Sequence, residues 1–138
     1  MKFFADTSFF AAYYDQSDQY NLQAEKLVKK FFQRHPQIIT SDYIYTETLT
    51  LLLKSHPFYG YHRSKLFDHH VIESNTFDMI FISDYLFKKA REIFFSFNKD
   101  KVWSFTDCTS FALMEDYGLK DALTFDKNFS QRGFKIVG

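Results

Sequence analysis

Four acidic side chains of this 138-residue chain stand where carboxylates could act together on one cation. Asp6 follows the stretch KFFA and Asp126 follows ALTF. The pattern of a short, mostly apolar run followed by an Asp therefore occurs twice. Asp107 lies in SFTDCTSFALM, and Glu47 lies in YTETLTLLL. Carboxylates that are brought together repel one another and their pKa values rise, a conflict that a divalent cation removes. All-oxygen ligands favour Mg²⁺ or Mn²⁺ over zinc.

Three of these acids also have an ordinary structural interpretation. Asp6 and Asp126 could each cap a helical segment that follows, because Asp is a favoured N-cap residue. Asp107, three residues after Ser104, could be an acid in the first turn of a helix, where the helix dipole favours it. Taken singly, none of the three requires a metal.

Glu47 is the acid that capping does not explain. In a helix it shares a face with Ile44 and Leu51, and we expect that face to pack on the sheet. No Lys or Arg stands three or four residues away to pair with it. An unpaired carboxylate near a core is costly unless it is protonated, hydrogen-bonded or bound to a cation. The alternative is a helix rotated so that Glu47 lies at the rim.

The acids are positioned by a regular alternation of strands and helices. Strands are predicted at 2–5, 37–40, 77–82, 121–125 and 134–137, and helices at 8–15, 18–34, 42–55, 57–70, 84–97 and 106–117. Such alternation is typical of an α/β fold with a parallel sheet covered on both faces, and the strand at 77–82 is expected to be buried. Gly118 is expected to close the helix before it as its C′ residue. Ligand sites of such sheets lie beyond the carboxyl ends of the strands, so Asp6 and Asp126 should share one edge.

Composition limits the class of protein. Lys and Arg total 17 and so do Asp and Glu, which argues against binding nucleic acid mainly by a broad basic face. A nuclease whose acidic site offsets basic residues elsewhere is still compatible. Cys108 is the only cysteine, which excludes an internal disulfide and fits a reducing cytosol. No uncharged apolar run approaches the roughly 18 residues of a membrane helix, and Asp6 interrupts the apolar N-terminus that a signal peptide needs. We expect one cytoplasmic domain over 1–138.

Together the segments ADTSFF, YTETLTLLL, SFTDCTSFALMEDYGLKDALTFDKNF and RGFKIV resemble the PIN-domain ribonucleases. Within that family the chain is most similar to the VapC toxins of bacterial and archaeal toxin–antitoxin pairs. The resemblance covers nearly the whole chain except 57–76, which does not align. The four metal-binding acids of the family fall on Asp6, Glu47, Asp107 and Asp126. Ser8 and Thr106 match hydroxyl positions that orient carboxylates or waters.

The resemblance implies a three-layer α/β/α sandwich around a mainly parallel five-stranded sheet. It implies Mg²⁺- or Mn²⁺-dependent cleavage of single-stranded RNA, by in-line attack of a metal-activated water on a phosphodiester. Asp6, Glu47 and Asp107 would hold the first metal, and Asp126 would contact it through water or help to hold a second. The resemblance implies an antitoxin protein as a partner, and we also expect a homodimer. SFFAAYYD and the helix face over 26–34 are candidate surfaces for either partner; the alternative is that core packing explains most of the Phe.

Basic residues near the acids are candidates for RNA contact. Lys99 and Lys101 precede Asp107, with Trp103 beside them for base stacking. Lys127 and Arg132 flank Asp126. The alternative is that these are solvated charges and that Trp103 belongs to the core.

Other functions fit these residues less well than a nuclease does. A haloacid dehalogenase-like phosphatase needs a second Asp two residues after the first, where this chain has Ser8, and a response-regulator receiver needs a pair of acids near its first strand. A binding protein that has kept the fold without chemistry is disfavoured because all four acids are present. A nuclease that matures cellular RNA without an antitoxin is not distinguished by the sequence.

Overall fold

A computed structural model describes residues 1–137 as five strands and the helices between them. The strands are β1 (Lys2–Ala5), β2 (Gln37–Ser41), β3 (Asp78–Ile80), β4 (Asp121–Leu123) and β5 (Lys135–Ile136). The helices are α1 (Thr7–Tyr14), α2 (Asn21–Phe31), α3 (Asp42–Lys54), α4 (Gly60–Asp68), α5 (Asp84–Phe97), α6 (Phe105–Asp116) and α7 (Asn128–Arg132), with a 3₁₀ turn η1 (Phe32–Arg34) and a π-helical turn η2 (His69–Glu73). The predicted alternation is confirmed.

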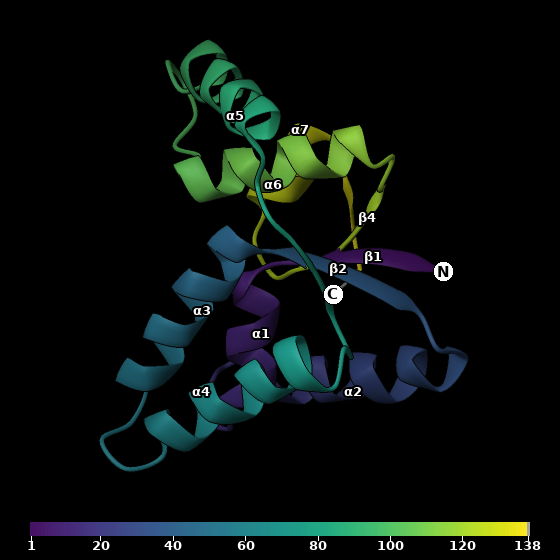
Figure 1. Cartoon of the computed structure of the whole chain (residues 1–138), viewed down its shortest axis with the longest axis vertical. Coiled ribbons are helices and arrows are strands. Elements are labelled where there is room, and N and C mark those ends of the chain that lie inside the picture. The colour runs from purple at the N-terminus through teal and green to yellow at the C-terminus, as the bar shows by residue number, and fades with distance from the viewer. Residues whose placement is uncertain (138) are drawn as a thin grey trace.

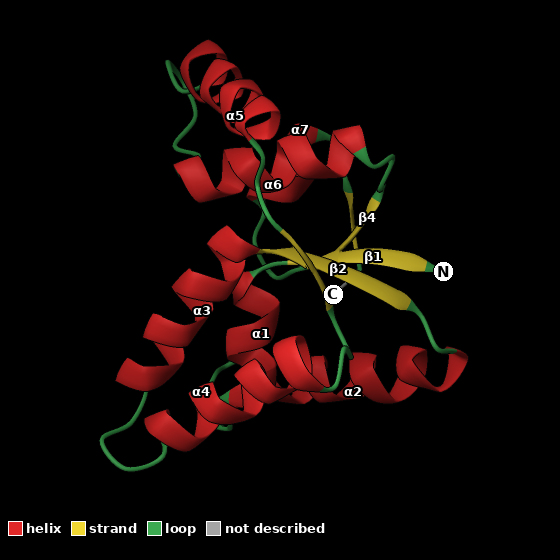
Figure 2. Ribbon diagram, in the orientation of Figure 1, coloured by secondary structure: helices red, strands yellow, loops and turns green. Residues whose placement is uncertain are grey.

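Two layers of helices enclose the sheet. Helices α1 to α4 pack together on one face, while α5, α6 and α7 lie on the other face, with α5 resting on α6 (Figure 1). All four strand pairs are parallel, in the order β3-β2-β1-β4-β5. Figure 2 shows the strands in yellow between the two layers of red helices. The predicted three-layer sandwich around a five-stranded parallel sheet is therefore confirmed.

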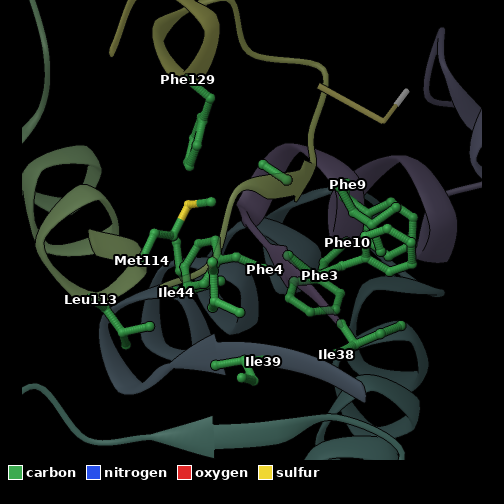
Figure 3. Packing of buried hydrophobic residues seen from close by; sticks show 14 of the residues in the cluster. Phe3, Phe4, Phe9, Phe10, Ile38, Ile39, Ile44, Leu113, Met114 and Phe129 are labelled. Atoms are coloured by element: carbon green, nitrogen blue, oxygen red, sulfur yellow. The ribbon is translucent and has the colours of Figure 1, made fainter. Parts of the chain in front are cut away.

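The central strand β1 supplies core residues to both layers, since successive side chains of a strand point to opposite faces. Phe3 packs edge-on against Phe31 of α2, with ring centroids 5.2 Å apart. Phe4, fully buried, faces Phe129 of α7 at 6.2 Å. Figure 3 shows Met114 of α6 and Phe129 approaching Phe4 from the same layer. Much of the high Phe content is thus core.

The strand order creates a switch point next to β1. The chain moves outward from β1 to β2 and β3, and then crosses to the other side of β1 to form β4. Connections on either side of such a point leave in opposite directions, which opens a crevice at the carboxyl ends of the two strands. Asp6 follows β1, and Asp126 lies three residues after the end of β4. The fold therefore brings the two strand-terminal acids to one crevice.

Several predicted elements differ in their bounds, among them the strand at 121–125, which ends at Leu123. The strand at 77–82 was expected to be buried, but β3 is a three-residue edge strand whose Asp78 is exposed. The helix expected at 18–34 begins at Asn21, because the Asp18 side chain accepts the N–H of Tyr20 and holds a turn there. The helix expected at 57–70 begins at Gly60, where a Cβ atom would lie 2.2 Å from the Leu53 carbonyl oxygen. That close approach sets the bend between α3 and α4.

The end of α6 agrees with the prediction. Gly118 follows the C-cap residue Tyr117 with φ of +66°, the left-handed conformation expected at the C′ position.

Among the described helices none is both long and apolar enough to cross a bilayer.

Candidate active site

Asp6 lies at the carboxyl end of β1 with its side chain almost wholly enclosed, at 4% exposure. Its Oδ1 atom accepts hydrogen bonds from the Ser8 hydroxyl at 2.8 Å and from the Phe9 N–H at 3.2 Å. Its Oδ2 atom accepts one from the Thr124 hydroxyl at 2.9 Å. Asp6 is therefore the N-cap of α1, as the structural interpretation expected, and it is also tied to the loop after β4.

Ser8 and Thr124 join the two loops of the switch point. Their hydroxyl oxygens lie 3.1 Å apart. Ser8 Oγ accepts the backbone N–H of Phe125, and Thr124 Oγ1 accepts that of Asp126, both at 2.9 Å. Each hydroxyl thus orients Asp6 and also holds the chain that leads into Asp126. Ser8 was predicted as such a positioning residue, whereas Thr124 was missed.

Asn128 connects Asp126 to Asp107 on α6. Its backbone N–H donates to Asp126 Oδ1 at 2.9 Å, and its Nδ2 donates to Asp107 Oδ2 at 3.0 Å. Asp107 also forms the capping box of α6, because it exchanges backbone N–H hydrogen bonds with Ser104. The structural interpretation of Asp107 is confirmed, but the Asn128 contact is additional to capping. Sequence reasoning missed Asn128, whose only signal was its place two residues after Asp126.

Glu47 is placed differently from the expectation. The buried residues of α3 are Ile44, Thr48 and Leu52, while Glu47 is exposed and Leu51 is 47% exposed. The prediction that the Glu47 face packs on the sheet was wrong, because residues spaced by four carry the core contact and one of them is a Thr. The rim alternative is the one observed, so burial cost gives no support to Glu47 as a ligand.

Glu47 nevertheless shares a hollow with a residue that flanks one of the acids. It lines a surface hollow together with Thr106, the residue before Asp107. Leu51 borders this hollow and also a second hollow, which Ser8 and Asp126 line. Hydrogen bonds through Thr124 and Asn128 therefore connect Asp6, Asp126 and Asp107. Glu47 lies in the neighbouring hollow, which shares Leu51 with the hollow of Asp126.

Burial and the neighbouring charge of Asp126 raise the pKa values of two of the three acids. Burial raises the pKa of Asp6 to about 7, against the lowering effect of its hydrogen bonds to Ser8, Thr124 and Phe9. Burial also raises the pKa of Asp107, against the hydrogen bond from Asn128. The charge of Asp126 raises the pKa of both groups further. Three carboxylates held this way form a negative site that favours a bound cation.

The donor set fits a hard divalent cation in kind, since every candidate ligand is a carboxylate or hydroxyl oxygen. The side chains do not form a closed cage as they stand. Within residues 1–137 no three acidic, His or Cys side chains lie close enough together to hold one ion. The assignment of Asp6, Glu47, Asp107 and Asp126 as metal ligands, with Ser8 and Thr106 behind them, stays a prediction.

Two candidates for RNA contact are engaged elsewhere. Trp103 is buried at 3% exposure, and its Nε1 donates to Gln131 Oε1 at 3.0 Å, so the base-stacking interpretation was wrong and the core interpretation holds. Arg132 donates through Nε to Glu115 Oε1 at 2.8 Å, and its guanidinium lies 4.7 Å from the ring centre of Phe97. Arg132 therefore has a structural role in this structure.

The three lysine candidates stay accessible to different degrees. Lys127 is exposed beside Asp126 and lines the same hollow. Lys99 is exposed and Lys101 half-buried in the loop between α5 and α6. Of these residues, Lys127 has the most direct access to a phosphate bound at the acids.

The pattern that defines the PIN-domain family matches residues 3–135. Since this covers nearly the whole chain, the chain belongs to the PIN-domain family. The observed three-layer α/β fold agrees with that family.

Particular relatives are similar over the full length. The curated sequences of the 23S rRNA-specific endonuclease VapC20 from Mycobacterium tuberculosis, strains CDC 1551 / Oshkosh and ATCC 25618 / H37Rv, are 31% identical over 134 residues, covering 97% of this chain and 96% of the relative. A crystal structure of M. tuberculosis VapC20, described as a sarcin–ricin loop cleaving toxin, superposes with a TM-score of 0.83 at 29% identity, covering 96% of this chain and 95% of that one. The resemblance to VapC toxins is therefore confirmed.

A more distant structure supports the fold alone. VapBC2 from Rickettsia felis, bound to a DNA fragment from its promoter, superposes with a TM-score of 0.65 at 12% identity. The superposition covers 99% of this chain and 97% of the VapBC2 chain. The architecture thus persists at an identity too low to transfer any residue role.

Proposed function

We propose that this chain is a Mg²⁺- or Mn²⁺-dependent endoribonuclease and the toxin of a toxin–antitoxin pair. One observation carries the proposal. Asp6, buried at the switch point, is joined through Thr124 to the loop of Asp126, and Asn128 joins that loop to Asp107. This acid cluster occurs in a PIN domain whose relative VapC20 is named as an rRNA endonuclease and described as a toxin.

The proposed ligands of the cation are Asp6, Asp107 and Asp126, with Glu47 at the rim. A divalent cation held there would lower the pKa of a water molecule and shield charge on the phosphate oxygens. The protein holds Asp6 through hydrogen bonds to both of its oxygens, which fixes the orientation of this carboxylate. Hydrogen bonds within residues 1–137 engage only Oδ2 of Asp107 and only Oδ1 of Asp126. One free oxygen on each is thus placed to take the proton of the attacking water.

The substrate proposed is RNA, with the sarcin–ricin loop of 23S rRNA as the first target to test. Support comes from the full-length similarity to VapC20, whose name and description specify that target. A cytoplasmic location, a homodimer and an antitoxin partner belong to the same proposal. A nuclease that matures RNA without an antitoxin, or a PIN-fold binding protein without activity, would be the alternatives.

The decisive experiment incubates the purified chain with ribosomal RNA in Mn²⁺, in Mg²⁺ and in EDTA. Primer extension should reveal a defined cut with either metal and none in EDTA. Asp107→Asn should abolish the cut while the melting temperature stays near that of the wild type, because Asn can still accept the Asn128 hydrogen bond. Asp116→Asn, on the exposed end of α6, is the matched control and should cut normally. Cleavage by Asp107→Asn at the wild-type rate would refute the assignment of the site.

A further inference from the structure

Two aromatic rings line the hollow beside Asp126 and have no part in the proposed hydrolysis. Tyr20 precedes α2, and Phe125 separates Thr124 from Asp126. Their rings are parallel to within 2°, with centroids 4.7 Å apart. Tyr20 is 37% exposed and Phe125 is half-buried.

We propose that this pair is a stacking subsite for one unpaired base of the RNA, next to the phosphate that is cut. This deepens the proposed nuclease function and rests on it.

The location of the pair connects it to the acids. The hollow has a volume of about 590 Å³, within the range of roughly 300–1,000 Å³ that small-ligand sites occupy. Ser8 and Asp126 line it together with Tyr20, Phe125 and Lys127. A nucleotide in this hollow would place its base against the rings while its phosphate lies within reach of Asp126 and the Lys127 ammonium group. The subsite is therefore continuous with the acid cluster.

Hydrogen bonds hold the backbone at both ring-bearing residues before any ligand arrives. The N–H of Tyr20 donates to Asp18 Oδ1 at 2.8 Å, and that of Phe125 donates to Ser8 Oγ at 2.9 Å. The turn before α2 is held further by Asn21, whose buried Nδ2 donates to the Ala12 carbonyl at 2.8 Å. A platform held in place in this way loses little conformational freedom when a base stacks on it.

The pair differs from aromatic contacts that serve the core. Phe9 and Tyr13 are also nearly parallel, but their centroids are 6.3 Å apart and Phe9 is fully buried. Neither Tyr20 nor Phe125 belongs to the buried cluster that holds the layers together, although Phe125 packs at its margin. Both residues of the stack instead line the hollow, where a planar ligand could extend it.

The charge balance of the chain adds a second reason. Basic and acidic residues are equal in number, so a broad basic face cannot supply most of the RNA affinity. Stacking of bases on aromatic rings supplies affinity without net positive charge and tolerates different sequences, because every base has a π face. In a protein of this composition, such a contact would help to hold a single strand at the acids.

The test uses a short RNA that spans the cut mapped on ribosomal RNA, together with a series in which each RNA lacks one base. Affinity is measured by fluorescence anisotropy in the Asp107→Asn background, and cleavage by single-turnover kinetics in the otherwise wild-type protein. Tyr20→Ala should weaken binding about tenfold, while Tyr20→Phe should bind as the wild type does. Tyr61→Ala, which removes an exposed ring on α4, should change neither quantity.

The base-deletion series separates stacking from a structural role. One abasic RNA should bind the wild-type ring pair about tenfold more weakly, and Tyr20→Ala should add no further loss on that RNA. The subsite would be overturned if the loss of affinity from Tyr20→Ala added to the loss from the missing base at every RNA position. It would also be overturned by a Tyr20→Ala variant that binds and cuts normally. If the wild type cuts no RNA at all, the proposed nuclease function fails as well, which is a distinct outcome.

Discussion

Thr124 donates its hydroxyl hydrogen to Asp6 Oδ2 at 2.9 Å, although 118 positions separate the two residues in the chain. Both side chains are buried, and the same hydroxyl oxygen accepts the backbone N–H of Asp126. Hydrogen bonds that a carboxylate accepts favour its ionised form, which is the form that binds a cation. Thr124 therefore positions two of the proposed ligands at once.

Replacing Thr124 by Val should test this role, because Val keeps the volume and removes the hydroxyl. The free energy of unfolding should fall by about 1–3 kcal/mol, since two buried polar groups lose their partner. Cleavage should slow by roughly 10–100-fold, as when a group behind a metal ligand is lost. Urea unfolding and single-turnover kinetics measure the two effects. Thr124→Ser keeps the hydroxyl and should retain most of the activity; equal behaviour of Val and wild type would contradict the role.

The stability of the metal-free protein should depend on pH through Asp6. Burial raises the pKa of this carboxyl group from 3.8 to about 7 in the folded state. Between these values the folded protein binds a proton that the unfolded chain has released, so the free energy of unfolding falls as pH rises from about 4 to 7. The full effect is on the order of 4 kcal/mol. Urea unfolding in EDTA at pH 4.5 to 8 should show this decline.

Asp6→Asn is the control for that measurement, because it removes the titrating group and should flatten the profile. The lowered pKa of His70 acts in the opposite direction, but it is common to both proteins and cancels in the difference between the profiles. Millimolar Mn²⁺ should stabilise the wild type most above pH 7, where Asp6 is ionised. Two superimposable metal-free profiles would show that Asp6 titrates normally.

The fold and two of the acids could be predicted from local pattern. An apolar strand followed by an Asp places both Asp6 and Asp126 at one edge, because all strands of a parallel sheet end on the same side. The capping roles of Asp6 and Asp107 were likewise visible, since they depend on residues within three positions.

The partners of those acids could not be predicted. Thr124 reaches Asp6 only because β4 lies next to β1, an adjacency that hydrophobic periodicity does not reveal. The error at Glu47 has a different cause. Thr48 is fully buried and occupies an inward position on α3, so a pattern of apolar residues alone selected the wrong face.

Replacing Lys127 should affect RNA binding, whereas replacing Arg132 should affect the stability of the fold. Lys127 is exposed beside the acids, so Lys127→Ala should weaken RNA binding and reduce the slope of log affinity against log salt by about one. Arg132 is paired with Glu115, so Arg132→Ala should lower the melting temperature and leave that slope unchanged. Salt titrations of RNA binding and thermal unfolding of both variants give the comparison. A reduced salt slope in Arg132→Ala would show that its ion pair opens to bind phosphate.

Glu47→Gln should separate a ligand role from a surface role. Because Glu47 is exposed, the free energy of unfolding without metal should stay within about 0.5 kcal/mol of the wild type. If Glu47 helps to hold the cation, cleavage should fall about 100-fold or more, and Mn²⁺ should raise the melting temperature less than in the wild type. Glu92→Gln, an exposed acid on α5, is the matched control and should change none of these quantities. Wild-type cleavage by Glu47→Gln would reduce the site to Asp6, Asp107 and Asp126, the three acids that Thr124 and Asn128 connect.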